Sequence, residues 1–222
     1  MTAVTTATER PQRRVPRPRA DAVRNRERIV AAARELLVEH GPVLPLDEVA
    51  RRAGVGNATL YRNFKDRGEL MHHVVLTVTD TITEHAERGL AAEDAGEATA
   101  FGALRTFVHA AAEERIGALC PMLHATFDSD HPDLVAARDR LTDVVEQLTE
   151  RARTAGELRP DIGVGDLMVA LSQLTRPLPG TGCPDFDRYV HRHLQLFLDG
   201  LMAPARSELP GVPATLEDLR QD

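Results

Sequence analysis

The amino-acid sequence predicts an all-α fold. Aromatic residues make up only 4% of the 222 residues, tryptophan is absent, and alanine, leucine, glutamate and arginine are plentiful, a composition that favours helices over sheets. Apolar residues recur at helical spacing along most of the chain, and no stretch alternates as a half-buried strand does. The 42% hydrophobic content is enough for a core, so we expect about nine helices in two groups.

Charge is unevenly distributed along the chain. The net charge is −7, but residues 1–70 carry 14 basic and 9 acidic side chains (net +5), whereas residues 71–222 carry 13 basic and 25 acidic ones (net −12). A positive N-terminal part joined to a negative remainder is typical of a nucleic-acid-binding segment attached to a second functional unit.

Several classes of protein are disfavoured. No apolar run approaches the roughly 20 residues that a membrane span needs, and the polar N-terminus lacks the apolar region of a secretory signal. Cys120 and Cys183 form neither a metal pattern nor a disulfide framework, so a cytoplasmic location is expected. The sequence contains no P-loop, dinucleotide-binding glycine pattern, HExxH or GxSxG motif, which predicts that the chain is not an enzyme and has no cofactor.

Residues 1–20 predict a disordered arm, because arginine and proline alternate there without any hydrophobic period. Such an arm is either merely solvated or lies along the phosphates or minor groove of DNA, and the sequence leaves both open. A first helix follows over residues 21–40, with Asp21 as its N-cap and Gly41 beyond its end. Its apolar stripe consists of Ile29, Ala33, Leu36 and Leu37.

A second short helix is predicted from Leu46 and a third over about residues 57–63. The run Gly54-Val55-Gly56 between them forces a tight turn, since Gly54 can adopt a positive φ and Gly56 can act as an N-cap. Leu60 and Phe64 then point into the core. Four polar side chains face outward from the third helix: Asn57, Thr59, Arg62 and Asn63.

A fourth helix begins with Asp66 and Glu69, which resemble a capping box, and is expected to end near residue 88, before a loop at residues 91–96. Further helices are predicted over about residues 97–119, 122–127, 132–155, 165–176 and 184–202. The predicted domains are an arm (1–20), a DNA-binding unit (21–66), a helical body (67–203) and a flexible tail (204–222).

Two short helices joined by a glycine-containing turn form a helix-turn-helix unit. Small residues allow the two helices to cross closely, and the third helix offers hydrogen-bonding side chains to base edges. The runs IVAAARELLVEHG and LDEVARRAGVGNATLYRNFKDRGEL closely resemble the N-terminal domain of the tetracycline-repressor (TetR) family, over about residues 22–72. RTAGELRPDIGVGDL, at residues 153–167, is a weaker match to the family's linker before its dimerising helices.

This resemblance implies a homodimer that binds double-stranded operator DNA and has a cavity for a small-molecule effector, whose binding releases the DNA. Pro45 departs from the family at the start of the second helix, where Ser or Thr is frequent, and Gly56 replaces a frequent Ser; glycine is tolerated at an N-cap. Seven residues match family positions that contact the bases or the phosphate backbone of DNA, or that lie beside such positions. They are Asn57, Thr59, Tyr61, Arg62, Asn63, Lys65 and Arg67.

Polar residues embedded in apolar runs are the best indication of an effector site, because a buried polar group needs a partner. A structural role in the core is the alternative for each. The candidate effector residues are Phe107, His109, Met122, His124, Phe127, Met168 and Gln173.

The last two predicted helices carry apolar stripes suited to helix–helix packing, and in the family such helices form a four-helix dimer interface. An internal core helix is the alternative. The candidate dimer residues are Leu167, Leu171, Leu174, Phe186, Val190, Phe197 and Leu201.

The stretch HATFDSDHPD, at residues 124–133, holds His124, Asp128 and His131 at spacings that a divalent metal could use. Aspartate and proline are also turn and helix-end residues, and the pairs His72-His73 and His191/His193 are no stronger. We therefore expect no metal site.

The predicted function is a ligand-responsive transcriptional regulator, expected to be a repressor, that shifts between DNA-competent and released states. One alternative is a DNA-binding regulator without a ligand, whose C-terminal part only dimerises. A second alternative, of a different class, is a helical enzyme or protein-interaction module.

Overall fold

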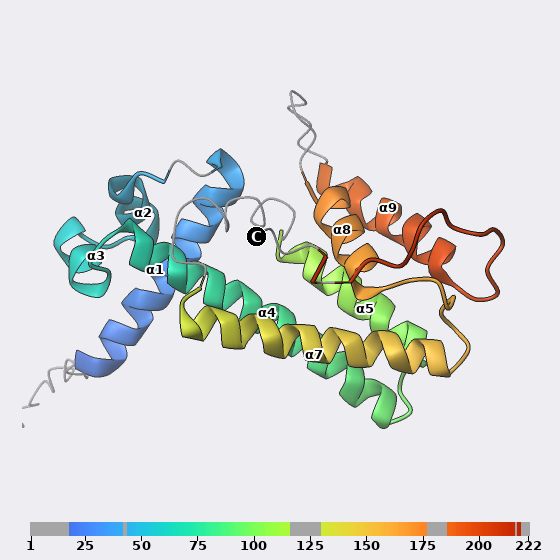
Figure 1. Ribbon diagram of the computed structural model, residues 1–222. Helices are drawn as coiled ribbons and strands as arrows, with labels where there is room; N and C mark the ends of the chain where they lie inside the picture. Colours follow the sequence, from blue (N-terminus) through green and yellow to red (C-terminus); the bar gives the residue numbers. More distant parts are fainter. Residues whose placement is uncertain (1–17, 42–43, 116–129, 177–185, 216, 219–222) are drawn as a thin grey trace, which may run out of the picture.

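The computed structural model describes residues 18–41, 44–115, 130–176, 186–215 and 217–218. These residues form eight helices and one isolated β-bridge, so the prediction of an all-α fold is confirmed. The predicted helix at 122–127 lies outside the described residues. The helices, labelled as in Figure 1, are α1 (Pro18–His40), α2 (Leu46–Ala53), α3 (Asn57–Asn63), α4 (Arg67–Asp94), α5 (Ala100–Glu113), α7 (Pro132–Thr154), α8 (Val164–Leu174) and α9 (Phe186–Leu201).

The first three helices form an N-terminal head (Figure 1). The apolar stripe predicted for α1 is buried there, against Leu60 and Phe64 of the α3 region. The helix begins at Pro18, three residues earlier than predicted, so Asp21 lies in the first turn and is not its N-cap. It ends as expected, because Gly41 takes a φ of 78° and donates its N–H to Leu37.

Helix α4 leaves the head and becomes the central helix of the body. Asp66 caps it by accepting a hydrogen bond from the Glu69 N–H, as predicted. The prediction of a loop at residues 91–96 is wrong for residues 91–94, since α4 continues to Asp94 and only Ala95 and Gly96 turn away. Alanines 91 and 92 are strong helix formers, and they carry the helix beyond its predicted end.

Helix α5 is shorter than the predicted span of 97–119. Its N-cap is Thr99, whose hydroxyl accepts from the Gly102 N–H at 3.0 Å, and its last residue is Glu113. The backbone turns at Arg115, where φ is 57°. Residues 116–119 of the predicted span lie outside the described residues.

The body is layered around α4. Helix α7 runs alongside it for most of its length, α5 packs against both, α9 packs on α5, and α8 packs on α9 and α7 (Figure 1). The described parts of α7, α8 and α9 begin and end within two residues of their predicted bounds. No helix within the described ranges is long and apolar enough to cross a membrane.

The segment after Ala203, for which the sequence predicts a flexible tail, folds back onto the body in its described part. Arg159, only 5% exposed, donates to the Ser207 carbonyl at 2.7 Å and pairs with Asp161. Ala214 accepts a hydrogen bond from the Gly165 N–H at 2.9 Å. These contacts attach residues 207–214 to the loop between α7 and α8 and to the start of α8.

Candidate nucleic-acid interface

The turn between α2 and α3 has the geometry that its glycines predict. Gly54 adopts φ 64° and ψ 37°, the left-handed conformation, and its N–H closes the end of α2. Gly56 is the extended N-cap of α3. Pro45 starts α2 without a side-chain cap, as the sequence suggested. The two helices therefore cross over a short, rigid connection.

Helix α3 has one buried and one exposed face. Leu60 and the following Phe64 are each 1% exposed and hold the helix against the head's core. On the outer face, Asn57 and Arg62 are exposed, and Tyr61 is 54% exposed, which is unusual for an aromatic side chain. This places a tyrosine and an arginine next to each other on the solvent-facing side of the helix.

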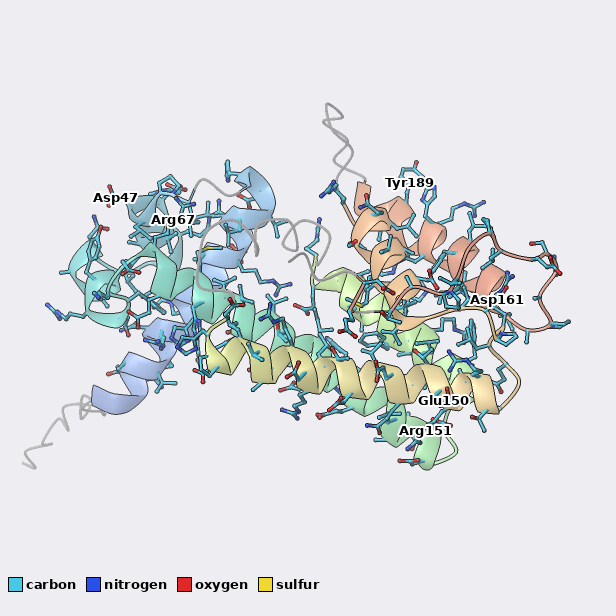
Figure 2. The ribbon with its side chains drawn as sticks, in the orientation of Figure 1. Asp47, Arg67, Glu150, Arg151, Asp161 and Tyr189 are labelled. Carbon is cyan, nitrogen blue, oxygen red and sulfur yellow. The ribbon has the colours of Figure 1, made fainter. Side chains whose placement is uncertain are left out.

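Two asparagines predicted to face outward make bonds within the head. The Asn57 side-chain amide donates to the Asp47 carboxylate at 2.9 Å, and Asp47 lies on the outer side of the head (Figure 2). The Asn63 amide donates to the Thr59 carbonyl at 2.8 Å, and both Asn63 and Thr59 are half-buried. Thr59 and Asn63 are therefore less available on the outer face than the pattern predicts.

The predicted basic positions after α3 are at the start of α4. Lys65 is exposed, and its backbone N–H donates to the Glu69 carboxylate at 2.7 Å, which fixes the chain just after α3. Arg67 (Figure 2) is half-buried, and its Nε–H has no hydrogen-bond partner within the described residues.

Other basic residues of the head are paired with carboxylates. Arg52 of α2 binds Glu39 of α1 through two hydrogen bonds of 2.8 Å. That contact lowers the pKa of Glu39 and raises the pKa of Arg52 above its ordinary value. Arg51 similarly binds Glu48. The charges of Arg51 and Arg52 are thus largely offset within the head.

Arg26 of α1, which the sequence analysis missed, connects α1 to the end of α3 and to α4. Its guanidinium donates to the Asn63 carbonyl at 2.6 Å and lies 4.4 Å from the centre of the Phe64 ring. It also hydrogen-bonds His73 of α4 and lies 3.7 Å from the Glu69 carboxylate. No local pattern marks this arginine, because its hydrogen-bond partners are 37 or more residues away in the chain.

The candidate effector residues do not gather in one cavity. Phe107 is 1% exposed and belongs to the core, Met168 packs partly against that core, and Gln173 is exposed on α8. Met122, His124 and Phe127 lie outside the described residues.

His109 is half-buried where α5 meets α9. Its Nδ1 lies 2.8 Å from that of His191, and its Nε2 lies 3.4 Å from the Gln195 amide oxygen. Burial lowers the pKa of His109. A small cavity of about 60 Å³ lies beside this group and is lined by Ala112, Glu113, Arg115, Thr175, Val190 and His191.

Most of the candidate dimer residues with described side chains face inward. Leu167, Leu171, Val190 and Leu201 are at most 7% exposed and belong to the chain's own core, as in the core alternative. The side chain of Phe186 lies outside the described part. Leu174 and Phe197 are half-buried and line a shallow, mainly apolar groove of about 460 Å³ between α8 and α9, together with Asp166, Val169, Ala170, Gln173 and His193.

Large apolar side chains are exposed on the two helices that form this groove. Leu196 is 59% exposed, Tyr189 46% and Val169 42%, and Tyr189 projects away from the body (Figure 2). Together with the groove, these three residues form the surface that is called the outer face of α8 and α9 below.

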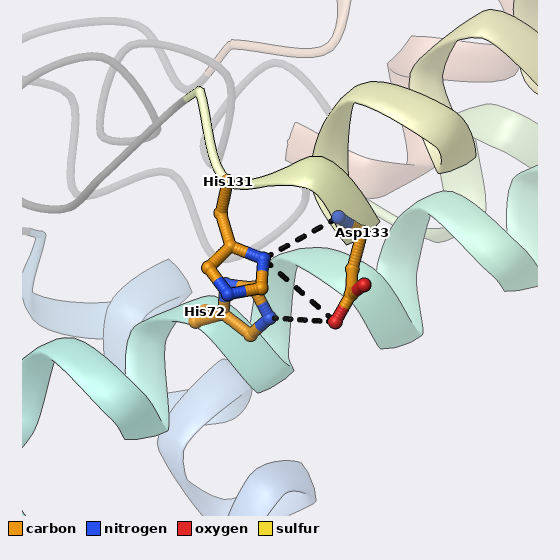
Figure 3. Close-up of side chains that lie close together, drawn as sticks. All are labelled: His72, His131 and Asp133. Carbon is orange, nitrogen blue, oxygen red and sulfur yellow. Dashed lines mark hydrogen bonds and ion pairs between the residues drawn. The ribbon is translucent and has the colours of Figure 1, made fainter.

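The sequence predicts no metal site, but one trio of possible ligands is found in the described part of the chain. His72 of α4 lies beside His131 and Asp133 of the α7 N-terminus, with one possible ligand atom of each within 4.8 Å of the others (Figure 3). His124 and Asp128, the other members of the predicted cluster, are outside the described residues.

Two family models match the chain. Residues 29–74 match the model of bacterial regulatory proteins of the tetR family, and residues 95–203 match the C-terminal domain of SbtR-like transcriptional regulators. Together they span well over half of the sequence and correspond to the head and the body.

Individual relatives agree with these models. An HTH-type transcriptional regulator of Staphylococcus aureus (SAUSA300_2515) is 37% identical over 68 residues, which is 30% of this chain and 37% of that protein. The chain thus spans little more than a third of the length of this curated relative.

Solved structures extend the likeness to most of the chain. The TetR transcriptional regulator SCO0520 from Streptomyces coelicolor is 28% identical with a TM-score of 0.58, covering 81% of this chain and 99% of the other. LfrR from Mycobacterium smegmatis, solved in complex with proflavine, has the same TM-score at 20% identity, covering 79% and 96%. At that identity, LfrR supports the fold alone.

Proposed function

The chain belongs to the TetR family of bacterial regulatory proteins, and from this we propose that it regulates transcription by binding operator DNA through α3 as a homodimer. The family and fold are those of transcriptional regulators and not of enzymes. We further propose that it is a repressor that a small-molecule effector releases from DNA.

The observation that carries this proposal is the outer face of α3. An exposed tyrosine with an adjacent exposed arginine is positioned to meet a phosphate and a base edge, contacts that give orientation and sequence preference respectively. No ion pair of the Arg62 or Lys65 side chain is found within the described residues, whereas Arg51 and Arg52 are paired. Arg62 and Lys65 are therefore the cations most available to phosphates.

We propose that the outer face of α8 and α9 is the dimer interface. The large apolar groups Leu196, Tyr189 and Val169 would be covered there, and burial of apolar surface is the main favourable term in such association. This differs from the predicted set, because four of the predicted leucine and valine residues already pack inside one chain.

An effector could be recognised where His109 and His191 meet between α5 and α9, since these imidazoles and Gln195 are polar groups at a largely apolar helix contact. LfrR, of the same fold, binds proflavine in its crystal structure. A small-molecule ligand is thus compatible with this fold.

A second candidate is DNA binding without an effector, which the packing between α5 and α9 favours. Phe107 is buried in the core, and the cavity of about 60 Å³ beside His191 is far below the roughly 300 Å³ of ordinary ligand pockets. A thermal-shift screen of small molecules, with hits tested for DNA release, distinguishes the two candidates.

DNA binding can be tested by selecting sequences from a random duplex library with the purified full chain. Two heads in a homodimer should select a palindrome whose half-sites are roughly 34 Å apart, and affinity should fall steeply with salt. The double variant Tyr61→Ala/Arg62→Ala should lose the selected site, whereas Arg105→Ala, at an exposed arginine on α5, should retain it. Unchanged binding by the double variant would refute the role of α3.

Dimerisation is tested separately by sedimentation. Leu196→Glu places a charge on the outer face of α8 and α9 and should give monomers, whereas Val135→Glu, at an exposed valine of α7, should leave the dimer intact. A dimer that survives Leu196→Glu would place the interface elsewhere.

A further inference from the structure

The cluster of His72, His131 and Asp133 unites residues that are distant in sequence. His72 is in the second turn of α4, whereas His131 caps α7 and Asp133 is in its first turn. The cluster therefore forms only when the two long helices pack side by side. It lies at the head end of the body, clear of the outer face of α8 and α9 (Figures 1 and 3).

The distances between the three side chains are too long for direct hydrogen bonds. The Asp133 Oδ2 atom lies 4.0 Å from His72 Nε2 and 3.7 Å from His131 Nδ1, beyond the usual range of a hydrogen bond. The two imidazole rings meet edge to face, with their centres 4.4 Å apart and their planes at 73°. The possible ligand atoms, two imidazole nitrogens and one carboxylate oxygen, all lie within 4.8 Å of one another (Figure 3).

This spacing is close to that of a metal coordination shell. In a tetrahedral zinc site, with metal–ligand bonds near 2.1 Å, neighbouring ligand atoms are about 3.4 Å apart. Closing the present gaps requires shifts well within reach of side-chain rotation, because the side chain of Asp133 is 66% exposed and that of His131 is 44% exposed. His72, at 15% exposed, is the more fixed of the three.

We propose that His72, His131 and Asp133 bind a first-row divalent transition-metal ion such as Zn²⁺. Two imidazoles and one carboxylate suit Zn²⁺, Co²⁺ or Ni²⁺ and not Mg²⁺ or Ca²⁺, which prefer oxygen ligands. The exposure of Asp133 leaves room for water to complete the shell. The neighbouring His73 is not part of this group, and its Nε2 hydrogen-bonds Arg26 instead.

The bound ion would join α4 to α7 across their contact. His131 Nδ1 also accepts the Asp133 backbone N–H at 3.3 Å, a long bond that coordination by this nitrogen would replace. The ordinary alternative is that Asp133 only offsets the positive end of the α7 dipole and His131 only caps the helix. The proposal does not depend on DNA binding.

Binding can be measured with the full chain, freed of any affinity tag and stripped with a chelator. Calorimetric titration with ZnCl₂ should give one site per chain, and excess Zn²⁺ should raise the Tm, since a ligand that binds only the native state stabilises it. Co²⁺ should give the visible absorption of a low-symmetry site, and MgCl₂ should give no heat.

Three variants separate coordination from helix capping. His72→Gln and Asp133→Asn each remove a ligand, and His131→Asn removes the imidazole while keeping a good N-cap residue. Each should weaken Zn²⁺ binding by at least about tenfold and abolish the rise in Tm. The matched control His40→Gln changes an exposed histidine at the end of α1 and should bind as the wild type does.

Two results would overturn the proposal. The first is that the wild-type chain binds no Zn²⁺ at one equivalent. The second is that the three variants, with circular dichroism spectra unchanged from the wild type, bind it with the wild-type affinity. In either case His131 and Asp133 serve only the N-terminus of α7.

Discussion

The guanidinium of Arg34 lies 2.7 Å from the carboxylate of Glu114, so the first helix of the head is directly paired with the end of α5 in the body. The Glu114 side chain is only 14% exposed, and its second oxygen lies 3.7 Å from His85 of α4. One carboxylate thus meets two other helices where the head and the body join.

Glu114→Gln should lower the free energy of unfolding by about 1–2 kcal/mol, because it leaves a partly buried arginine without its counter-charge. The measurement is urea denaturation at a fixed protein concentration. Glu87→Gln removes the exposed carboxylate that pairs with Arg140 and should cost much less. Equal losses of unfolding free energy in the two variants would mean that the contact between Arg34 and Glu114 contributes no more than an exposed ion pair does.

Arg26→Lys should weaken the junction between α1, α3 and α4. Lysine keeps the charge but cannot lie flat on the Phe64 ring while donating to the Asn63 carbonyl, so we expect a loss of about 1–2 kcal/mol in stability. Affinity for the selected DNA should also decrease. Arg24→Lys, on the exposed side of the same helix, serves as the control and should change neither quantity.

Substitution should lower the stability of the fold at Gly54 and raise it at Gly56. Gly54→Ala forces a β-carbon into a backbone with φ 64° and should cost about 1–2 kcal/mol. At Gly56, a β-carbon would meet no atom within 4 Å, and the φ of −76° is an ordinary one. Gly56→Ser should therefore add a cap worth a few tenths of a kcal/mol. Thermal unfolding of both variants tests this; stabilisation by Gly54→Ala would contradict the left-handed turn.

Stability should decrease on mild acidification because of His109. Its pKa is lowered in the fold, chiefly by burial and also by His191 and Arg105, against the raising effects of Gln195 and Glu113. The unfolded chain therefore binds more protons than the native one below the ordinary value of 6.5. The stability associated with the neutral ring is complete above pH 6.5 and is lost as the pH falls toward the lowered value.

Urea denaturation between pH 7.5 and 5.5 measures this dependence. His109→Gln keeps a polar side chain without the titration and should reduce the slope of stability against pH. A slope that is the same in wild type and variant would assign the effect to other groups.

Gly165→Ala should detach the C-terminal segment from α8. A β-carbon there would lie 2.5 Å from the Thr215 carbonyl oxygen, and because this is backbone the segment itself must move. Hydrogen exchange in residues 204–215 should become faster. Gly200→Ala, where a β-carbon meets nothing within 4 Å, should leave the exchange unchanged.

Local signals predicted the helix-turn-helix unit well. Gly54, Gly56 and Asp66 each act within a few residues of themselves, and the structure has each in its predicted role. The ends of α4 and α5 were less predictable, since small residues near 91–94 suit a loop or a helix and packing decides between them.

Contacts between distant residues could not be predicted from the pattern. Arg34 and Glu114 are 80 positions apart, and His72 meets His131 only because α4 and α7 lie side by side. The stripe of Leu167 and Leu171 illustrates a related limit. Periodicity identifies a face that will be buried, but not whether the chain itself or a second subunit covers it.

The uninterrupted length of α4 has a mechanical consequence. Its 28 residues span about 42 Å at 1.5 Å per residue, with one end among the head helices and the other at the far end of the body (Figure 1). A rigid rod of that length converts an angular change of about 5° at its body end into a displacement of roughly 4 Å at the head. If the proposed effector tilts α4, the helix would act as a lever, and a few degrees of tilt would displace α3 relative to the DNA groove.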